Sequence, residues 1–82
     1  MSKDENQYQP ISCELYSEFE LAIMQQQQIK LVWHEAGQTR IATVKPLDLK
    51  TKNHQEFLLA KDHQGKALQI RLDYIRSQVF IG

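Results

Sequence analysis

The 82-residue sequence has little of several residue types, and each shortage excludes a class of protein. Its single cysteine, Cys13, rules out an internal disulfide, so we expect a reducing, cytoplasmic setting. Its three glycines are isolated, which leaves no glycine-rich loop to hold a phosphate. No apolar run is long enough to span a bilayer, and the polar residues 1–7 do not have the pattern of a signal peptide. We therefore expect no association with a membrane.

Catalytic and metal-binding patterns are also missing. His34, His54 and His63 are scattered, and with one cysteine they do not give the paired spacing of a zinc site. Cys13 needs a histidine beside it in space to act as a nucleophile, and a packing role is the simpler interpretation. Glutamates on the surface of so small a domain lack the cleft in which a carboxylate pair catalyses. We expect a protein that is not an enzyme and has no cofactor or metal.

An apolar content of 41% is ordinary for a folded protein, and 82 residues make one domain with a modest core. We expect residues 8–82 to form this domain and residues 1–7 to be a flexible tail. The formal net charge is zero, but the charges are unevenly divided. Residues 1–20 carry five acids and one lysine, whereas residues 21–82 carry nine basic residues and five acids. Such a division favours a charged partner.

One helix is predicted at about residues 12–25. Ser12 suits the N-cap position, and Ile11 and Tyr16 have the spacing of a hydrophobic staple. At 100° per residue, one face gathers the residues that we expect to face the core, which are Leu15, Phe19, Ala22 and Ile23.

A separate stripe of this helix faces outward and holds Glu14, Glu18, Leu21 and Gln25. Glu14 and Glu18 are a like-charge pair at i, i+4, which weakens a helix by a few tenths of a kcal/mol. Two interpretations remain open. The stripe is either a solvated surface whose small cost has no consequence, or a docking surface for a basic partner.

After residue 28 the pattern changes from helical to alternating, which indicates β-strands. Residues 29–45 predict two strands around a turn at Ala36 and Gly37, and Pro46 then ends regular pairing or marks an edge. The remaining chain is interpreted, in order, as a polar connection at 47–55, a hairpin at 56–72 that turns at 62–65, a tight turn at 73–77 and a short last strand at 78–82.

The predicted fold is mainly β with one N-terminal α-helix. Because about five short strands leave exposed edges in a small open sheet, we expect closure into a five- to six-stranded Sm-like or SH3-like barrel, with the helix packed over one end. The main alternative is an OB-type barrel, which usually places its helix between the third and fourth strands.

Small barrels often bind single-stranded nucleic acid through exposed aromatic rings and a basic groove. The aromatic residues here, Trp33, Phe57, Tyr74 and Phe80, lie in alternating patterns that favour the core. The basic residues are spread along the chain, and the pI is about 6.8. A single-stranded RNA-binding protein is therefore the alternative function.

The segment YQPISCELYSEFELA at residues 8–22 resembles the opening of the Rof family, bacterial inhibitors of the transcription termination factor Rho. LDLKTKN at residues 47–53 and IRLDYI at residues 70–75 resemble later parts of the same family. The residues that carry the first resemblance are Tyr8, Gln9, Pro10, Ile11 and Cys13, followed by Glu20, Leu21 and Ala22.

This resemblance implies an Sm-like, cytoplasmic Rho-binding antiterminator that covers the primary site where Rho takes up pyrimidine-rich single-stranded RNA. A groove that attracts phosphates is basic, so an acidic helix excludes RNA by charge and by bulk. The free protein is expected to be a monomer and not to contact nucleic acid directly. The residues expected to contact Rho are Glu14, Glu18, Glu20 and Leu21 on the helix, with Lys52 and Asn53 from the polar loop.

The sequence departs from the family in its charge. Members are typically acidic overall, whereas here the net charge is zero and Leu15 and Ser17 stand where relatives can have aspartate. We therefore expect weaker long-range attraction to a basic partner than in those relatives.

Overall fold

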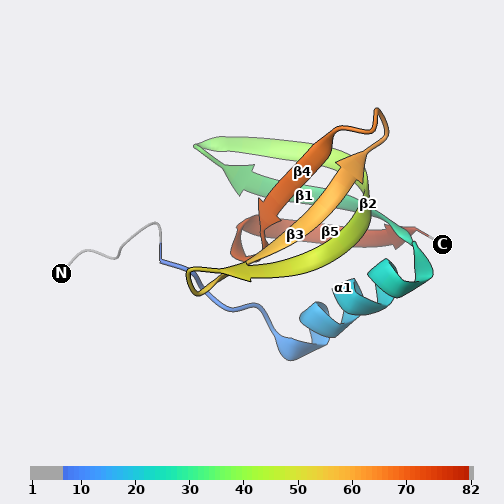
Figure 1. Ribbon diagram of the computed structural model, residues 1–82. Coiled ribbons are helices and arrows are strands. Elements are labelled where there is room, and N and C mark those ends of the chain that lie inside the picture. Colours follow the sequence, from blue (N-terminus) through green and yellow to red (C-terminus); the bar gives the residue numbers. More distant parts are fainter. Residues whose placement is uncertain (1–6, 82) are drawn as a thin grey trace.

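The structure of the protein is a computed structural model that describes residues 7–81. The tail expected at residues 1–7 lies, apart from Gln7, outside the described residues. One helix is followed by five strands, as Figure 1 shows. The elements in chain order are α1 (Cys13–Gln25), β1 (Gln28–Glu35), β2 (Gln38–Lys52), β3 (Gln55–Asp62), β4 (Ala67–Arg71), the 3-10 helix η1 (Leu72–Tyr74) and β5 (Ile75–Ile81).

Helix α1 begins and ends where its sequence predicts. Ser12 is the N-cap, and its Oγ accepts a hydrogen bond from the backbone N–H of Leu15 at 3.2 Å. Gln26 ends the helix with a left-handed φ of 55°. Phe19 and Ala22 are fully buried, as the predicted core-facing side requires.

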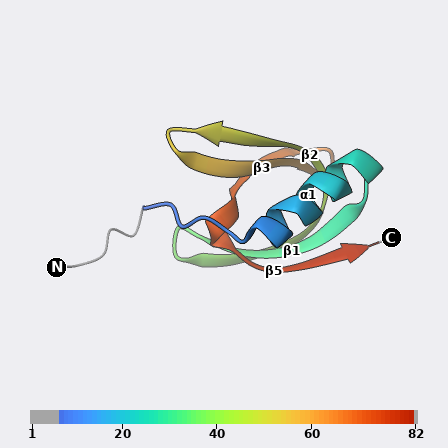
Figure 2. The ribbon, with the colours of Figure 1, turned by 90° about the horizontal axis from the view of Figure 1, so that it is seen from below.

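The five strands form one antiparallel sheet in the order β4-β3-β2-β1-β5. The sheet is strongly curved, and α1 lies between the β2–β3 hairpin on one side and β1 with β5 on the other (Figure 2). Strands β4 and β5 are its edges and do not pair with each other within residues 7–81. The mainly β fold with one helix is thus confirmed, whereas the closed barrel is not, because the sheet stays open.

Strand β2 is longer than the sequence predicts. Pro46 is buried within it and pairs with Ala60, and the register shifts between Pro46 and Asp48. The predictions that Pro46 ends regular pairing or marks an edge, and that residues 47–55 form a connection, are therefore wrong, because pairing continues to Lys52 and β2 lies between β3 and β1. A bulge tolerates a residue without an N–H donor and also bends the strand, so the proline marks the point of curvature and not the end of the strand.

Both predicted hairpin turns are present. Ala36 and Gly37 connect β1 to β2 with φ values of 52° and 75°, which is the backbone of a tight two-residue hairpin turn. The β3–β4 turn is closed by Asp62, whose Oδ1 accepts hydrogen bonds from the backbone N–H groups of Gln64 and Lys66, both at 2.9 Å.

The core lies between the concave face of the sheet and α1. Ile29, Leu31 and Trp33 alternate inward along β1, as predicted, and the rings of Phe19 and Phe80 are 5.9 Å apart. Within residues 7–81, no helix has the length and apolar character needed to cross a membrane. The buried apolar residues are Phe19, Ala22, Ile29, Leu31, Trp33, Val44, Leu58, Ala60, Ile70 and Leu72.

Candidate partner-binding surface

The outward side of α1 presents two exposed glutamates and a half-exposed leucine. Glu14 and Glu18 are exposed, and Leu21 is 50% exposed beside them. Neither glutamate takes part in an ion pair among residues 7–81, where the ion pairs join other residues. The like charges of this helix are therefore not neutralised within the described chain, and the stripe is accessible to a basic partner.

Glu20 lies on a different flank of α1, about 120–160° around the helix axis from Glu14 and Glu18 at 100° per residue. It borders β2, where it lines a cleft of about 300 Å³. The structure thus does not gather the three predicted glutamates into one narrow stripe. The residues that line the cleft with Glu20 are Tyr16, Ile23, Met24, Asp48 and Leu49.

A second cleft, of about 430 Å³, continues along the same flank toward the start of α1 and also includes Tyr16. Burial raises the pKa of the Tyr16 hydroxyl, and the nearby carboxylates of Glu56, Glu20 and Asp48 raise it further. This flank is therefore acidic too, and Asp48 and Glu56 are members that the sequence analysis did not identify. The lining residues are Pro10, Ile11, Cys13, Tyr16, Ser17 and Glu56.

The predicted loop residues Lys52 and Asn53 lie at the β2–β3 turn and are exposed. Asn53 and His54 have φ values of 53° and 63°, so two non-glycine residues adopt the left-handed backbone that a two-residue hairpin turn requires. Since β2 and β3 supply Asp48 and Glu56 to the clefts, this hairpin borders the Glu20 flank of α1 and not the flank of Glu14 and Glu18.

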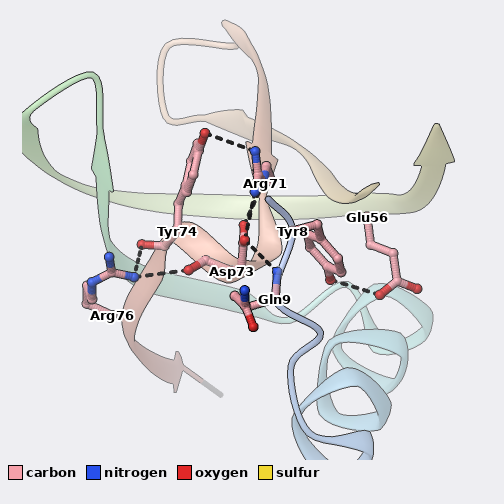
Figure 3. Close-up of polar contacts among 7 residues, drawn as sticks. All are labelled: Tyr8, Gln9, Glu56, Arg71, Asp73, Tyr74 and Arg76. Atoms are coloured by element: carbon pink, nitrogen blue, oxygen red, sulfur yellow. Dashed lines mark hydrogen bonds and ion pairs between the residues drawn. The ribbon is translucent and has the colours of Figure 1, made fainter. Parts of the chain in front are cut away.

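A buried ion pair lies at the end of β4, beside the segment that leads into α1 (Figure 3). The Arg71 side chain is 6% exposed, and its Nε and Nη2 donate to the two carboxylate oxygens of Asp73 at 2.8 and 2.9 Å. Its guanidinium carbon lies 4.7 Å from the ring centroid of Tyr74 and 5.7 Å from that of Tyr8. The hydrogen-bonded carboxylate of Asp73 raises the pKa of Arg71.

This ion pair also fixes the chain ahead of α1. The backbone N–H of Gln9 donates to Oδ2 of Asp73 at 2.9 Å, and the Tyr8 hydroxyl donates to Oε1 of Glu56 at 2.8 Å (Figure 3). Burial, and then the bond to Glu56, raise the pKa of Tyr8. Residues 8 and 9 thereby join η1 to the β2–β3 hairpin, which positions the first turn of α1 beside that hairpin.

The aromatic rings considered as a nucleic-acid platform are largely inside. Trp33 is 4% exposed and donates from Nε1 to Oε1 of Glu35 at 3.0 Å. Tyr74 and Phe80 pack against the core, and Phe57 is half-buried. Base stacking needs exposed ring faces, so these rings do not form a stacking surface.

Comparison with known proteins identifies a structural likeness but no family. No protein-family model matches the chain, and no curated protein matches it. The fold is similar to part of the proteasome accessory factor B/C (PafBC) of Arthrobacter aurescens, with a TM-score of 0.75 and 21% sequence identity. The likeness covers 90% of this chain and 12% of that one, and at this identity it concerns the fold alone.

Proposed function

We propose that this protein is a Rho-binding antiterminator, which inhibits Rho-dependent termination by occupying the primary RNA-binding site of Rho. The observation that carries the proposal is the exposed acidic stripe of Glu14 and Glu18, which no basic residue neutralises within residues 7–81. It is supported by the resemblance of residues 8–22 to the Rof family, in which this segment leads into an acidic helix.

The charges of α1 suit a site that takes up RNA. A groove for single-stranded RNA carries basic side chains for the phosphates, and carboxylates in an ordered helix attract the same side chains. The half-exposed Leu21 adds an apolar contact at the centre of the acidic surface. Because a folded helix is also bulky, a bound copy excludes RNA sterically as well as by charge.

The two flanks of α1 place a condition on the complex. Glu20 lies on the flank that the β2–β3 hairpin borders, and Lys52 with Asn53 lie at the tip of that hairpin. Glu14 and Glu18 lie on the other flank. A groove that contacts all of these residues therefore has to enclose the outward half of α1 and reach the hairpin tip.

The fold name belongs to the same proposal. A helix followed by a bent five-stranded antiparallel sheet in the order β4-β3-β2-β1-β5 supports the description Sm-like, although the sheet is open. The alternative function, direct binding of single-stranded RNA, has less support because the aromatic rings that would stack on bases are largely buried.

The proposal is tested by competition for Rho. Fluorescence anisotropy of labelled oligo-dC bound to purified Rho is followed while the protein is titrated in, beside a control titration onto the oligonucleotide alone. A fall in anisotropy with Rho and no change in the control supports the proposal. Binding to the oligonucleotide without displacement from Rho contradicts it and favours the RNA-binding alternative.

A further inference from the structure

The convex face of the sheet, opposite the core, carries three exposed lysines. Lys30 alternates with the inward residues of β1, and it pairs with Val79 of β5 on one side and with Thr43 of β2 on the other. Lys45 is two residues from Thr43 on β2 and pairs with Lys61 of β3. Side chains two apart on a strand share a face. We call this surface the lysine face, and it comprises Lys30, Lys45 and Lys61 with the apolar Val32, Ile41 and Val79.

The charge of the lysine face is not balanced on the face itself. The outward positions of β1, of β5 and of β2 as far as Lys45 hold no acid, by the same alternation. Lys45 and Lys61 are direct cross-strand partners, and like charges in that position destabilise a sheet. The lysine face therefore gains most from an acidic partner.

Apolar residues lie at the centre of the lysine face. Val32 and Ile41 are cross-strand partners, Ile41 is 64% exposed and Val79 is 54% exposed. A face with an apolar centre and charges around it is typical of protein interfaces. None of the six residues of the lysine face has an aromatic ring for a base to stack on, so its composition favours an acidic protein surface over a nucleic acid.

The complementary surface is present on the same molecule. The outward side of α1 also has an apolar centre, with Leu21 50% and Met24 80% exposed, and it carries the like-charge pair of Glu14 and Glu18. Of the large apolar side chains that are exposed among residues 7–81, only Leu47 lies on neither surface. Leu21 and Met24 lie on the outward side of α1, where Met24 also lines the Glu20 cleft, and Ile41 and Val79 lie on the lysine face. Ile81, two residues from Val79 on β5, shares the face of Val79, so five of these side chains gather on two faces of opposite charge.

We propose that the lysine face binds the acidic outward side of α1 of a second copy of this chain. Each copy carries both surfaces, so the contact is head-to-tail and can repeat from copy to copy. A 13-residue helix is about 20 Å long, which gives a contact smaller than that of a stable dimer. The association is therefore weak, reversible and sensitive to salt, and the protein is a monomer when dilute.

The contact has one consequence for binding to Rho, which rests on the proposed function. The side of α1 that faces Rho is the side that a second copy covers, so self-association and Rho binding exclude each other. The self-association itself needs no Rho, and the test below is made without it.

Sedimentation velocity of the full chain, from low micromolar to near-millimolar concentration and at low and high salt, tests the proposal. The parent protein is expected to sediment faster as its concentration rises in low salt, and to remain a monomer in high salt. A parent that stays monomeric throughout overturns the proposal. If such a monomer binds labelled oligo-dC and loses this binding in Lys45→Glu/Lys61→Glu, the lysine face is assigned to nucleic acid instead.

Charge reversals then locate the contact. Glu14→Lys/Glu18→Lys and Lys45→Glu/Lys61→Glu each reverse one surface, and each is expected to abolish the concentration dependence. The control Lys50→Glu/Lys52→Glu makes the same change in net charge as Lys45→Glu/Lys61→Glu, but farther along β2, beyond the bulge. It is expected to associate like the parent. Association that survives in either reversed variant overturns the proposal.

A variant that carries both reversals, Glu14→Lys/Glu18→Lys/Lys45→Glu/Lys61→Glu, returns the formal net charge to zero with the two surfaces exchanged in sign. It is expected to associate again, as a head-to-tail contact between opposite charges requires. If it is folded by circular dichroism and remains monomeric, the two surfaces do not contact each other and the proposal is overturned.

Discussion

Two groups of charged residues in this protein differ in burial and in pairing. The side chains of Arg71 and Asp73 are 6% and 9% exposed, and they form an ion pair with Nε of Arg71 2.8 Å from Oδ1 of Asp73. Glu14 and Glu18 are exposed and have no ion-pair partner within residues 7–81. A buried charge has lost its hydration and depends on its partner, whereas an exposed charge keeps its hydration. The first group therefore acts on stability, and the second is free to act on binding.

The largest effect is expected from Arg71→Met, which leaves the Asp73 carboxylate buried without its cation. We expect the free energy of unfolding, measured by urea denaturation, to fall by about 3–5 kcal/mol. The control is Arg40→Met, since the contact of Arg40 with Glu35 is long, at 4.0 Å, and about half exposed. Its loss is expected to cost about 0–1 kcal/mol.

Removing both buried partners sharpens the same prediction. Arg71→Met/Asp73→Leu leaves no unpaired charge, so it is expected to lose less stability than Arg71→Met alone. Two results would show that the buried pair does not have the assigned role. One is a double variant that loses as much stability as Arg71→Met or more, and the other is an equal loss in Arg71→Met and Arg40→Met.

A smaller effect is expected from Tyr8→Phe, which removes the 2.8 Å hydrogen bond to Glu56 but keeps the ring beside Arg71. We expect the free energy of unfolding to fall by about 1 kcal/mol. Tyr16→Phe is the matched control, because the Tyr16 hydroxyl makes no hydrogen bond within the described chain. Equal losses in the two variants would contradict the role given to the Tyr8 hydroxyl.

The same hydroxyl predicts a dependence on alkaline pH. Burial and Glu56 raise the pKa of Tyr8 above its ordinary value of about 10, so the folded protein retains a proton that the unfolded chain releases. The contribution of the protonated Tyr8 hydroxyl to the free energy of unfolding is complete below about pH 10 and is lost as the pH rises further. The stability difference between the parent and Tyr8→Phe should therefore shrink above about pH 10, as urea denaturation in a pH series measures. A difference that stays constant contradicts the assignment.

The smallest effect is expected from Glu18→Gln, which relieves the repulsion between Glu14 and Glu18. We expect the helix to gain about 0.2–0.5 kcal/mol, seen as a higher urea midpoint with an unchanged slope. Glu18 is the better position to change, because Glu14 lies in the first turn of α1, where the helix dipole favours a negative charge. A lower midpoint would mean that Glu18 has a stabilising contact within the protein.

Local signals in the sequence account for α1 and for the two predicted hairpin turns. The Ser12 N-cap, the 3.6-residue apolar period and the Ala36–Gly37 pair each act over a few residues. The full length of β2 was not predicted because a proline usually ends a strand. Here a bulge in the pairing of β2 with β3 accommodates Pro46.

The candidate site could be predicted only in part, because part of it depends on contacts between residues that are distant in the sequence. The exposed stripe of Glu14 and Glu18 follows from the helical period alone. The place of Glu20 beside Asp48 depends on how α1 lies against β2, and the bond from Gln9 to Asp73 joins residues 64 apart in the chain. No local pattern contains such contacts, so the acidic cleft and the buried ion pair required the folded structure.

The central claim, that the exposed glutamates of α1 act on binding and not on stability, is tested by measuring both properties of Glu14→Gln/Glu18→Gln. The control is Gln64→Lys/Gln69→Lys, which makes the same change in net charge at exposed positions of the β3–β4 hairpin. The account predicts that Glu14→Gln/Glu18→Gln unfolds at nearly the parent urea concentration and displaces oligo-dC from Rho poorly, while the control displaces it like the parent. Displacement by Glu14→Gln/Glu18→Gln as strong as that by the control would contradict the account.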